Sequence, residues 1–192
     1  PDGSPSRYTL LARGKLGGRE MSYHSDLDLL LVYEADGRTQ PLPGTTKSRH
    51  SPTENHGYFT ELAQKLIKAL GQMGPAGKLY TVDMKLRPTG KSGSLVVPLE
   101  EFVRYFATGG GAIWERLALT RARPVPGDAE FSQQVMGAVR EAVSGANWCP
   151  QSLEEIRSTR SKLESSCNPR SLKRAPGGLM DVEFLVQSLQ LK

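Results

Sequence analysis

The sequence has few cysteines, no long apolar run and no strongly one-sided charge, and each absence excludes a class of protein. The two cysteines, Cys149 and Cys167, fit neither a metal-ligand spacing nor a disulfide framework, so a reducing cytoplasm is the expected compartment. No apolar run reaches the length of a membrane-spanning helix, and the first residues lack a signal-peptide pattern. We therefore expect a cytoplasmic protein that does not interact with a membrane.

The composition is that of an ordinary globular protein with a moderate excess of positive charge. Of the 192 residues, 38% are hydrophobic and 23% are charged, which argues against wholesale disorder. The net charge of +5 suits an anionic ligand, which could be a nucleotide, a nucleic acid or an acidic protein surface. The basic residues are scattered, without a basic helix or an aromatic stacking platform, so no nucleic acid partner is expected.

The central feature of the sequence is a glycine pair followed by two carboxylates. Gly17 and Gly18 lie shortly before the apolar run 27–33, and Asp26 and Asp28 lie where that run begins. Successive side chains of a strand point to opposite faces, so the two carboxylates project together. They repel each other unless a cation lies between them, and Mg²⁺ that also holds substrate phosphates fits that place. This pattern predicts a metal-dependent, phosphate-handling site.

A third carboxylate is expected from a second strand over residues 79–86. Polar residues alternate with apolar ones along it, so Asp83 can face Asp26 and Asp28 if the two strands are neighbours. Three carboxylates around two Mg²⁺ ions would form a clamp that activates a hydroxyl and neutralises a triphosphate. The alternative is that Asp83 forms a structural ion pair with Lys85, two residues further on.

Other residues are candidates for phosphate binding. Without a Cβ atom, Gly17 and Gly18 let backbone N–H groups approach phosphate oxygens, although a glycine pair by itself is usually just a turn. Side chains that could bind the phosphate or stabilise charge on the transferred group are those of Ser25, Lys85, Arg87 and Lys91.

Hydrophobic periodicity predicts a mixed α/β front and a helical back. The expected strands cover residues 8–12, 27–33, 79–86 and 94–97. The expected helices cover residues 53–71, 98–108, 113–123, 129–143, 152–164 and 179–191, with Thr53 and Asp128 as N-caps. We expect a catalytic domain over residues 1–125 and a helical domain over 126–192 that is truncated at its C-terminal end, in a fragment of a longer protein.

Two groups of later residues are expected to be structural. Arg121 and Arg123 follow Trp114-Glu115 on one predicted helix, where packing and ion pairing are favoured over phosphate binding. Asp181 and Glu183 lie two residues apart on the last helix and therefore on different faces, so they do not repeat the geometry of the first carboxylate pair.

Together, these motifs resemble known nucleotidyltransferases. The glycine pair and D-x-D strand resemble the superfamily that includes DNA polymerase β and kanamycin nucleotidyltransferase. A closer resemblance is to glutamine synthetase adenylyltransferase, and the motifs that carry it occur in the same order. They are Gly14-Lys15-Leu16-Gly17-Gly18-Arg19-Glu20, Ser25-Asp26-Leu27-Asp28-Leu29, Val82-Asp83-Met84-Lys85-Leu86-Arg87-Pro88-Thr89-Gly90, Trp114-Glu115 with Ala118-Leu119 and Arg121-Ala122-Arg123, Gly127-Asp128, and Gly177-Gly178-Leu179-Met180-Asp181-Val182-Glu183-Phe184.

The resemblance implies an α+β, polymerase-β-like fold with a mixed sheet and flanking helices, followed by a helical segment. It implies Mg²⁺-dependent transfer of AMP from ATP to a tyrosine hydroxyl of glutamine synthetase, which regulates nitrogen metabolism, or removal of AMP by phosphorolysis. Asp26 and Asp28 would bind two metal ions, and Asp83 would bind the catalytic one. Glutamine synthetase and, through the full-length bifunctional enzyme, a PII-type signalling protein are the implied partners.

The motif wording is more like the C-terminal, adenylylating half of that enzyme. Arg116 stands where the adenylylating half commonly has histidine, which leaves the adenylyl-removing half open. Lys85 also departs from the pattern, because arginine is expected in its place. Lysine keeps the charge but not the bidentate phosphate contact. The remaining alternatives are another transferase of the same superfamily and a binding module that has lost catalysis. The presence of all three aspartates disfavours the binding module.

Overall fold

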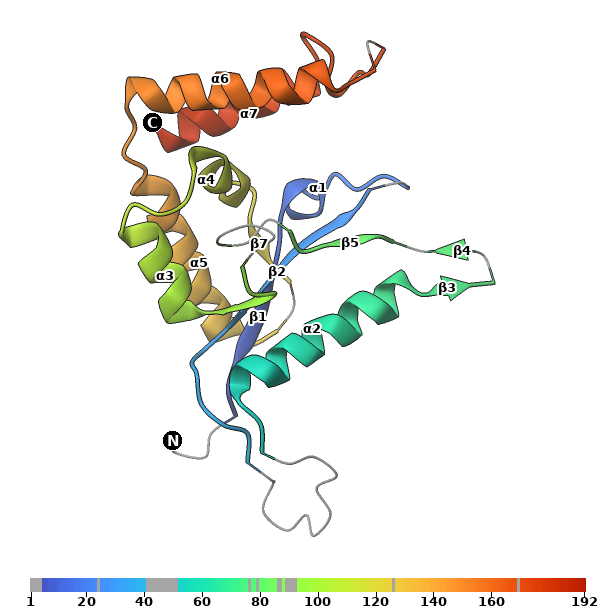
Figure 1. Cartoon of the computed structure of the whole chain (residues 1–192), viewed down its shortest axis with the longest axis vertical. Coiled ribbons are helices and arrows are strands. Elements are labelled where there is room, and N and C mark those ends of the chain that lie inside the picture. The colour runs from blue at the N-terminus through green and yellow to red at the C-terminus, as the bar shows by residue number, and fades with distance from the viewer. Residues whose placement is uncertain are drawn as a thin grey trace.

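The computed structural model describes residues 5–23, 25–40, 52–75, 77–78, 80–85, 88, 93–125, 127–168 and 170–192. Its elements (Figure 1) are, in chain order, β1 (Tyr8–Ala12), α1 (Gly14–Gly17), β2 (Leu27–Tyr33), α2 (Asn55–Gly71), β3 (Met73–Gly74), β4 (Gly77–Lys78), β5 (Val82–Asp83), β6 (Val96–Pro98), α3 (Leu99–Ala107), α4 (Ile113–Leu119), β7 (Arg123–Pro124), α5 (Ala129–Ser144), α6 (Pro150–Ser165) and α7 (Leu179–Leu191).

Strand β2 lies at the centre of a five-stranded mixed sheet. It pairs with β1 in antiparallel orientation, with Tyr8 opposite Tyr33, and β7 extends the sheet on the far side of β1. On its other edge β2 pairs in parallel with two short strands, with β5 at its start and with β6 at its end. The mixed sheet with helices around it confirms the expected α+β class.

Both faces of β2 are covered, as its nearly continuous apolar sequence predicts. Leu30 and Val32 join the core that α3 and α5 form, whereas Leu29 and Leu31 join a second core on the side of α2. Figure 1 shows α2 on one side of β1 and β2, and α3 with α5 on the other. Each leucine buried in this way contributes roughly 1.5–3 kcal/mol of hydrophobic stabilisation, which fixes the strand that carries Asp28.

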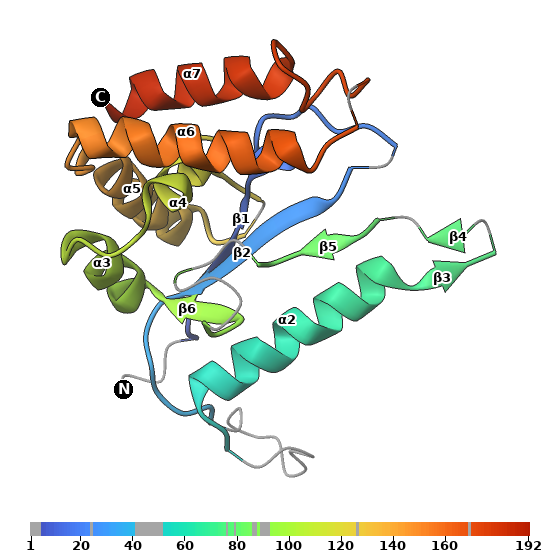
Figure 2. The same cartoon turned by 45° about the horizontal axis from the view of Figure 1, so that its top comes forward.

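Helices α6 and α7 lie side by side (Figure 2) and meet α4 in a third, smaller core. Ile113 and Leu117 of α4 contact Ile156 of α6 and Leu191 of α7 there. Four apolar side chains of α7 are more than half exposed, those of Leu179, Val182, Leu185 and Leu189. The bounds expected for the last helix, and its apolar character, are thus confirmed, while much of its apolar surface contacts solvent.

Several expected elements have other bounds in the structure, and β6, α3, α5 and α6 differ from the expectation by one or two residues at an end. Helix α2 begins at Asn55, with Glu54 rather than Thr53 at the N-cap position. Strand β5 has two residues instead of the expected eight, because it pairs with β2 only opposite Leu27 and Asp28. The alternation was still informative, since Tyr80, Val82 and Met84 all pack in the core on the α2 side.

The expected helix over residues 113–123 is also wrong at its C-terminal end. Helix α4 stops at Leu119, and the Thr120 hydroxyl donates to the carbonyl of Leu117 at 2.7 Å. Arg123 then pairs with Ala12 of β1, and Pro124, which follows, cannot continue a helix. By contrast, Asp128 is the expected N-cap of α5, and its Oδ1 accepts the N–H of Phe131 at 2.7 Å.

Candidate active site

Asp28 and Asp83 lie directly opposite each other on the parallel strands β2 and β5. The N–H of Leu27 donates to the carbonyl of Thr81 at 2.7 Å and holds the two strands together at this point. Side chains at paired positions of adjacent strands lie on the same face of a sheet. Strands β2 and β5 are therefore neighbours in the sheet, as expected, and this brings Asp83 next to Asp28.

The charges of the acidic residues act on one another. Burial raises the pKa of Asp28, and the negative charges of Asp83 and then Asp26 raise it further, against the lowering effect of Arg13. Asp26 is exposed and Asp28 is half-buried, so the acidic surface is open to solvent on one side. Concentrated negative charge of this kind favours a bound cation.

The backbone of the glycine turn contacts the carboxylate of Asp28. Gly14 has φ of +52°, and a Cβ atom on it would lie 2.4 Å from Oδ2 of Asp28. The N–H of Arg13 donates to the carbonyl of Asp28 at 2.9 Å. Only glycine combines this left-handed conformation with so close an approach, so the first glycine of the motif serves the position of Asp28.

Gly17 and Gly18 allow a close approach of a different kind. A Cβ atom on Gly17 would lie 2.0 Å from the carbonyl oxygen of Arg121, and one on Gly18 would lie 2.1 Å from Nη2 of Arg121. Their N–H groups donate within the turn, to the carbonyls of Arg13 at 2.9 Å and Gly14 at 3.1 Å. Packing against Arg121 thus explains the glycine pair structurally, and phosphate binding by these N–H groups stays a prediction.

The ion pair of Asp83 with Lys85, which the sequence offered as the alternative to metal binding by Asp83, is present. Oδ1 of Asp83 accepts the backbone N–H of Lys85 at 2.8 Å, and Oδ2 accepts its ammonium group at 3.0 Å. Partial burial favours the neutral carboxyl, but these contacts outweigh it and hold the pKa of Asp83 below its ordinary value. In this conformation Lys85 therefore neutralises Asp83, while the predicted phosphate ligands Arg87 and Lys91 lie outside the described residues.

Ser25 is buried in the loop before β2 and already has partners. Its Oγ accepts the N–H of Ser22 at 2.9 Å and lies 2.9 Å from the hydroxyl of the same residue. The Lys15 ammonium approaches it at 3.5 Å. These contacts fix the chain where it enters β2, and the expected contact of Ser25 with phosphate stays a prediction.

Two cations beside the acidic residues were not predicted from the sequence. Arg13 is 3% exposed and lowers the pKa of both Asp28 and Asp83, and Lys173 lowers the pKa of Asp28. Arg13 directly precedes the glycine motif, so its position in the chain was a usable signal. Lys173 lies between α6 and α7, and nothing in the local sequence connects it with Asp28.

The acidic residues fit Mg²⁺ by their chemistry rather than by a preformed cage. Carboxylate oxygens are the ligands that Mg²⁺ prefers, and the pKa of Asp28 is raised by burial first and then by the negative charges of Asp83 and Asp26, which a cation would offset. Within the described part of the chain, however, no three His, Cys, Asp or Glu side chains are grouped closely enough to hold a metal ion. Asp83 would have to exchange its contact with Lys85 for the metal.

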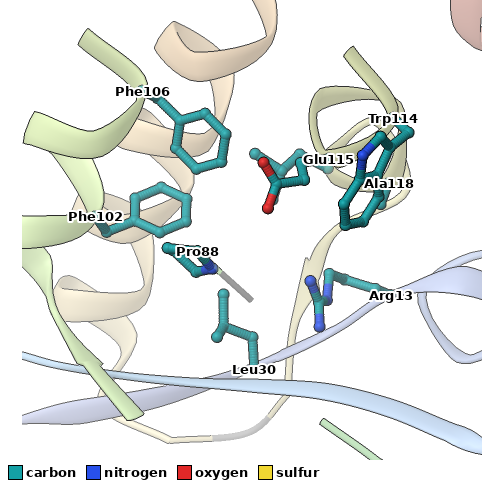
Figure 3. A pocket seen from close by; sticks show the side chains of 9 residues that line it. Arg13, Leu30, Pro88, Phe102, Phe106, Trp114, Glu115 and Ala118 are labelled. Carbon is teal, nitrogen blue, oxygen red and sulfur yellow. The ribbon is translucent and has the colours of Figure 1, made fainter. Parts of the chain in front are cut away.

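A small, mainly apolar cavity lies between the sheet and helices α3 and α4 (Figure 3). The guanidinium of Arg13 and the carboxylate of Glu115 point into it, among Phe102, Phe106 and Trp114. Oε2 of Glu115 accepts the hydroxyl of Tyr105 at 2.8 Å and the N–H of Ala112 at 2.9 Å. The packing role expected for Trp114-Glu115 is thus supported.

Comparison with known proteins places this α+β chain in the adenylyltransferase class. Residues 2–138 match the model of the family described as Glutamate-ammonia ligase adenylyltransferase. The chain belongs to this family.

Similar curated proteins carry the name bifunctional glutamine synthetase adenylyltransferase/adenylyl-removing enzyme. The protein from Xanthobacter autotrophicus is 39% identical over 186 residues, covering 95% of this chain and 18% of the relative. Those from Thioalkalivibrio sulfidiphilus and Pseudomonas aeruginosa are 38% and 35% identical and cover 99% and 98% of this chain, each over 19% of the relative. The chain thus spans about a fifth of the length of these relatives.

Proposed function

We propose that this chain is a Mg²⁺-dependent nucleotidyltransferase domain of polymerase-β-like fold that transfers AMP from ATP to a tyrosine hydroxyl of glutamine synthetase. The observation that carries the proposal is the in-register pairing of Asp28 with Asp83, next to Asp26, in a chain of the adenylyltransferase family. Paired carboxylates at this point of a sheet suit the handling of a metal-bound triphosphate.

Asp26, Asp28 and Asp83 would hold the metal ions, which supply neutralisation of the triphosphate and of the leaving pyrophosphate when bound. Asp83 is the candidate acceptor for the proton of the tyrosine hydroxyl. The tyrosine oxygen forms a bond to the α-phosphorus as the bond to pyrophosphate breaks, and the proton passes to a carboxylate oxygen of Asp83. The ammonium group of Lys85, now on Asp83, would move to the phosphates as Asp83 takes up its role.

The direction of transfer is the adenylylating one in this proposal. Arg116, which argued against it in the sequence, is 6% exposed and donates to the carbonyls of Phe106 at 2.8 Å and Gly110 at 3.2 Å. It also donates to the carbonyl of Ala142. Arg116 therefore holds α3, α4 and α5 together, and an arginine in this structural position is compatible with adenylylation. The adenylyl-removing half, with phosphate as nucleophile and ADP as product, is the second candidate because it would use the same carboxylates.

Glutamine synthetase is the proposed substrate protein, and a PII-type signalling protein is a proposed partner of the longer enzyme in the cytoplasm. The curated relatives are named bifunctional glutamine synthetase adenylyltransferase/adenylyl-removing enzyme, which supports glutamine synthetase as the substrate. No helix within the described residues is both long and apolar enough to span a bilayer.

The division into a catalytic domain over residues 1–125 and a helical domain over residues 126–192 is also a proposal. Phe131 and Val135 of α5 pack in the core that Leu30 of β2 shares.

Transfer of labelled AMP from α-labelled ATP to purified glutamine synthetase, with and without Mg²⁺, tests the proposal. We expect transfer by the unmodified chain and a loss of about a thousandfold in Asp28→Asn, which keeps the shape of the side chain but removes its charge. Asp128→Asn is the matched control, because asparagine caps α5 as well as aspartate does. Phosphate-dependent release of ADP from adenylylated glutamine synthetase, without forward transfer, would support the second candidate. Equal rates in Asp28→Asn and Asp128→Asn would contradict both.

A further inference from the structure

The segment that follows α4 contacts the glycine turn through both of its arginines. The guanidinium of Arg123 donates to the carbonyls of Leu16 at 3.0 Å and Gly17 at 3.3 Å. The backbone carbonyl and the guanidinium of Arg121 occupy the space that Cβ atoms would need on Gly17 and Gly18. The turn is therefore shaped against a segment that lies far along the chain.

Arg121 also links this turn to the last helix. Its Nη1 donates to Oε1 of Glu183 on α7 at 2.9 Å, and its Nη2 lies 2.5 Å from Oε2 of Glu20, which follows the turn. The side chains of Arg121 and Glu183 are 16% and 30% exposed, so this pair is only partly screened by solvent, whereas Glu20 is 60% exposed. Burial opposes the charged form, but the two carboxylates outweigh it and raise the pKa of Arg121.

The position of the turn matters for the acidic residues because the turn begins at Gly14, which contacts Asp28. The N–H of Arg13 donates to the carbonyl of Asp28, and Gly14 contacts the Asp28 carboxylate. A displacement of Gly17 and Gly18 therefore moves a short helix whose first residue touches a proposed metal ligand. A shift of about 1 Å in such a place is enough to lower a rate by two orders of magnitude.

We propose that Arg121 is a positioning residue of the nucleotidyl-transfer site: through its direct contacts with the turn it holds Gly17 and Gly18 in place beside Asp28. The inference rests on the proposed function, since the turn is the predicted phosphate-binding element. Arg121 needs no contact with substrate for this role. Its planar fork reaches two carboxylates in different directions, whereas a lysine ammonium would reach only one of them at full strength.

Arg160 provides a matched control for loss of a buried, bridging arginine. It lies on α6, its side chain is 11% exposed, and it pairs with Asp181 on α7. It also donates to the carbonyls of Arg174 at 3.0 Å and Ala175 at 3.2 Å. These contacts fasten α7 to α6, so Arg160→Ala weakens the docking of α7 without removing a group that contacts the glycine turn.

The experiment compares Arg121→Ala, Arg121→Lys and Arg160→Ala in the 192-residue chain by two measurements. The first is hydrogen exchange of the Gly17 and Gly18 amides without nucleotide, where both N–H groups are hydrogen-bonded in the turn. We expect about tenfold faster exchange in Arg121→Ala and an intermediate effect in Arg121→Lys. The second is the dissociation constant of Mg²⁺–ATP, which we expect to rise about tenfold in Arg121→Ala. Arg160→Ala should leave both values within about twofold.

Unchanged exchange at Gly17 and Gly18 in Arg121→Ala would overturn the inference, and so would equal changes in Arg121→Ala and Arg160→Ala. The unfolding free energy of each variant, from urea titration, separates loosening of the turn from general destabilisation. Failure of the unmodified chain to bind Mg²⁺–ATP would count against the proposed function, and with it against a role of Arg121 in nucleotidyl transfer. The link between Arg121 and the turn would still be decided by the exchange rates.

Discussion

A Cβ atom on Gly14 would lie 2.4 Å from Oδ2 of Asp28, so the glycine turn and the carboxylate at the start of β2 are in direct contact. The contact is reinforced by the hydrogen bond from the N–H of Arg13 to the carbonyl of Asp28 at 2.9 Å. Any side chain at position 14 must displace either the turn or the carboxylate. The two parts of the motif, which are separated in sequence, act as one structural unit.

Gly14→Ala should therefore abolish binding of Mg²⁺–ATP, because the added Cβ displaces Asp28 in addition to straining the backbone of the turn. The left-handed φ of +52° makes alanine unfavourable by about 1–2 kcal/mol, and the contact with Asp28 adds to this. Gly109→Ala is the matched control, because Gly109 has φ of +78° but no neighbouring atom within 4 Å of the place that a Cβ would take. Urea unfolding should show a loss of stability in both variants, and titration with Mg²⁺–ATP should show loss of binding only in Gly14→Ala. Unchanged binding of Mg²⁺–ATP by Gly14→Ala would show that the turn and Asp28 do not act as one structural unit.

Lys85→Met should raise the pKa of Asp83. Partial burial already favours the neutral carboxyl, and the variant removes the ammonium group that opposes this effect. A depressed pKa stabilises the fold above the unfolded-state value, and the contribution is lost as pH falls through the folded-state value. The measurement is a ¹³C NMR titration of the Asp83 carboxyl. Lys65→Met, which removes an exposed pair with Glu61 on α2, should leave the curve unchanged.

Asp28→Asn should be inactive yet more stable than the unmodified chain at neutral pH without metal. Burial and the charges of Asp83 and Asp26 raise the pKa of Asp28, so the ionised carboxylate is unfavourable in the folded state. A raised pKa of Asp28 therefore stabilises the fold at low pH, where the carboxyl is neutral, and this contribution to the free energy of unfolding is lost as pH rises from the unfolded-state to the folded-state pKa. Unfolding free energies at pH 4 and pH 7 measure this. Mg²⁺ should stabilise the unmodified chain and not the variant, and a less stable variant at pH 7 would contradict the prediction.

Arg116→Ala should destabilise the fold by about 2–4 kcal/mol, because it leaves several buried carbonyls without their charged donor. Among these are the carbonyls of Phe106 and Gly110. Arg157→Ala, which removes an exposed arginine of α6, should cost under about 0.5 kcal/mol. Arg116→His is the sharper variant for function, because it should lower stability without reversing the direction of AMP transfer. A switch from adenylylation to ADP release in Arg116→His would contradict the structural role.

Sequence patterns predicted the elements whose pattern is local and strong. The strand over residues 27–33 and the helix over 179–191 have the expected bounds. A nearly continuous apolar run defines the strand, and an apolar side that begins after Gly178 defines the helix, without help from the rest of the chain. The pairing of Asp83 with Lys85, which the sequence offered as the alternative to a metal site, depends on short-range order as well. The approach of Asp83 to Asp28 needed one further assumption, that their strands are neighbours, which the structure supports.

The remaining features depend on contacts between distant segments. The length of β5 is set by how far β2 offers it a partner, and the end of α4 is set by the pairing of Arg123 with Ala12 on β1. The reason for Gly17 and Gly18 lies in Arg121, and the cation that acts on Asp28 from the α6–α7 segment is Lys173. No local pattern carries this information, because the partners are brought together only by the folded chain.

The position of Lys173 has a consequence for engineering. Its charge acts on Asp28 from a segment just before α7, while α5 packs on the central sheet and Glu183 pairs with Arg121. The smallest unit that retains these charges around Asp28 must therefore extend at least to Lys173. A shortened version that ends at residue 125 would keep all three aspartates but lose Lys173, whose charge acts on Asp28. The three-aspartate motif alone therefore does not define the shortest chain that keeps the charge environment of Asp28.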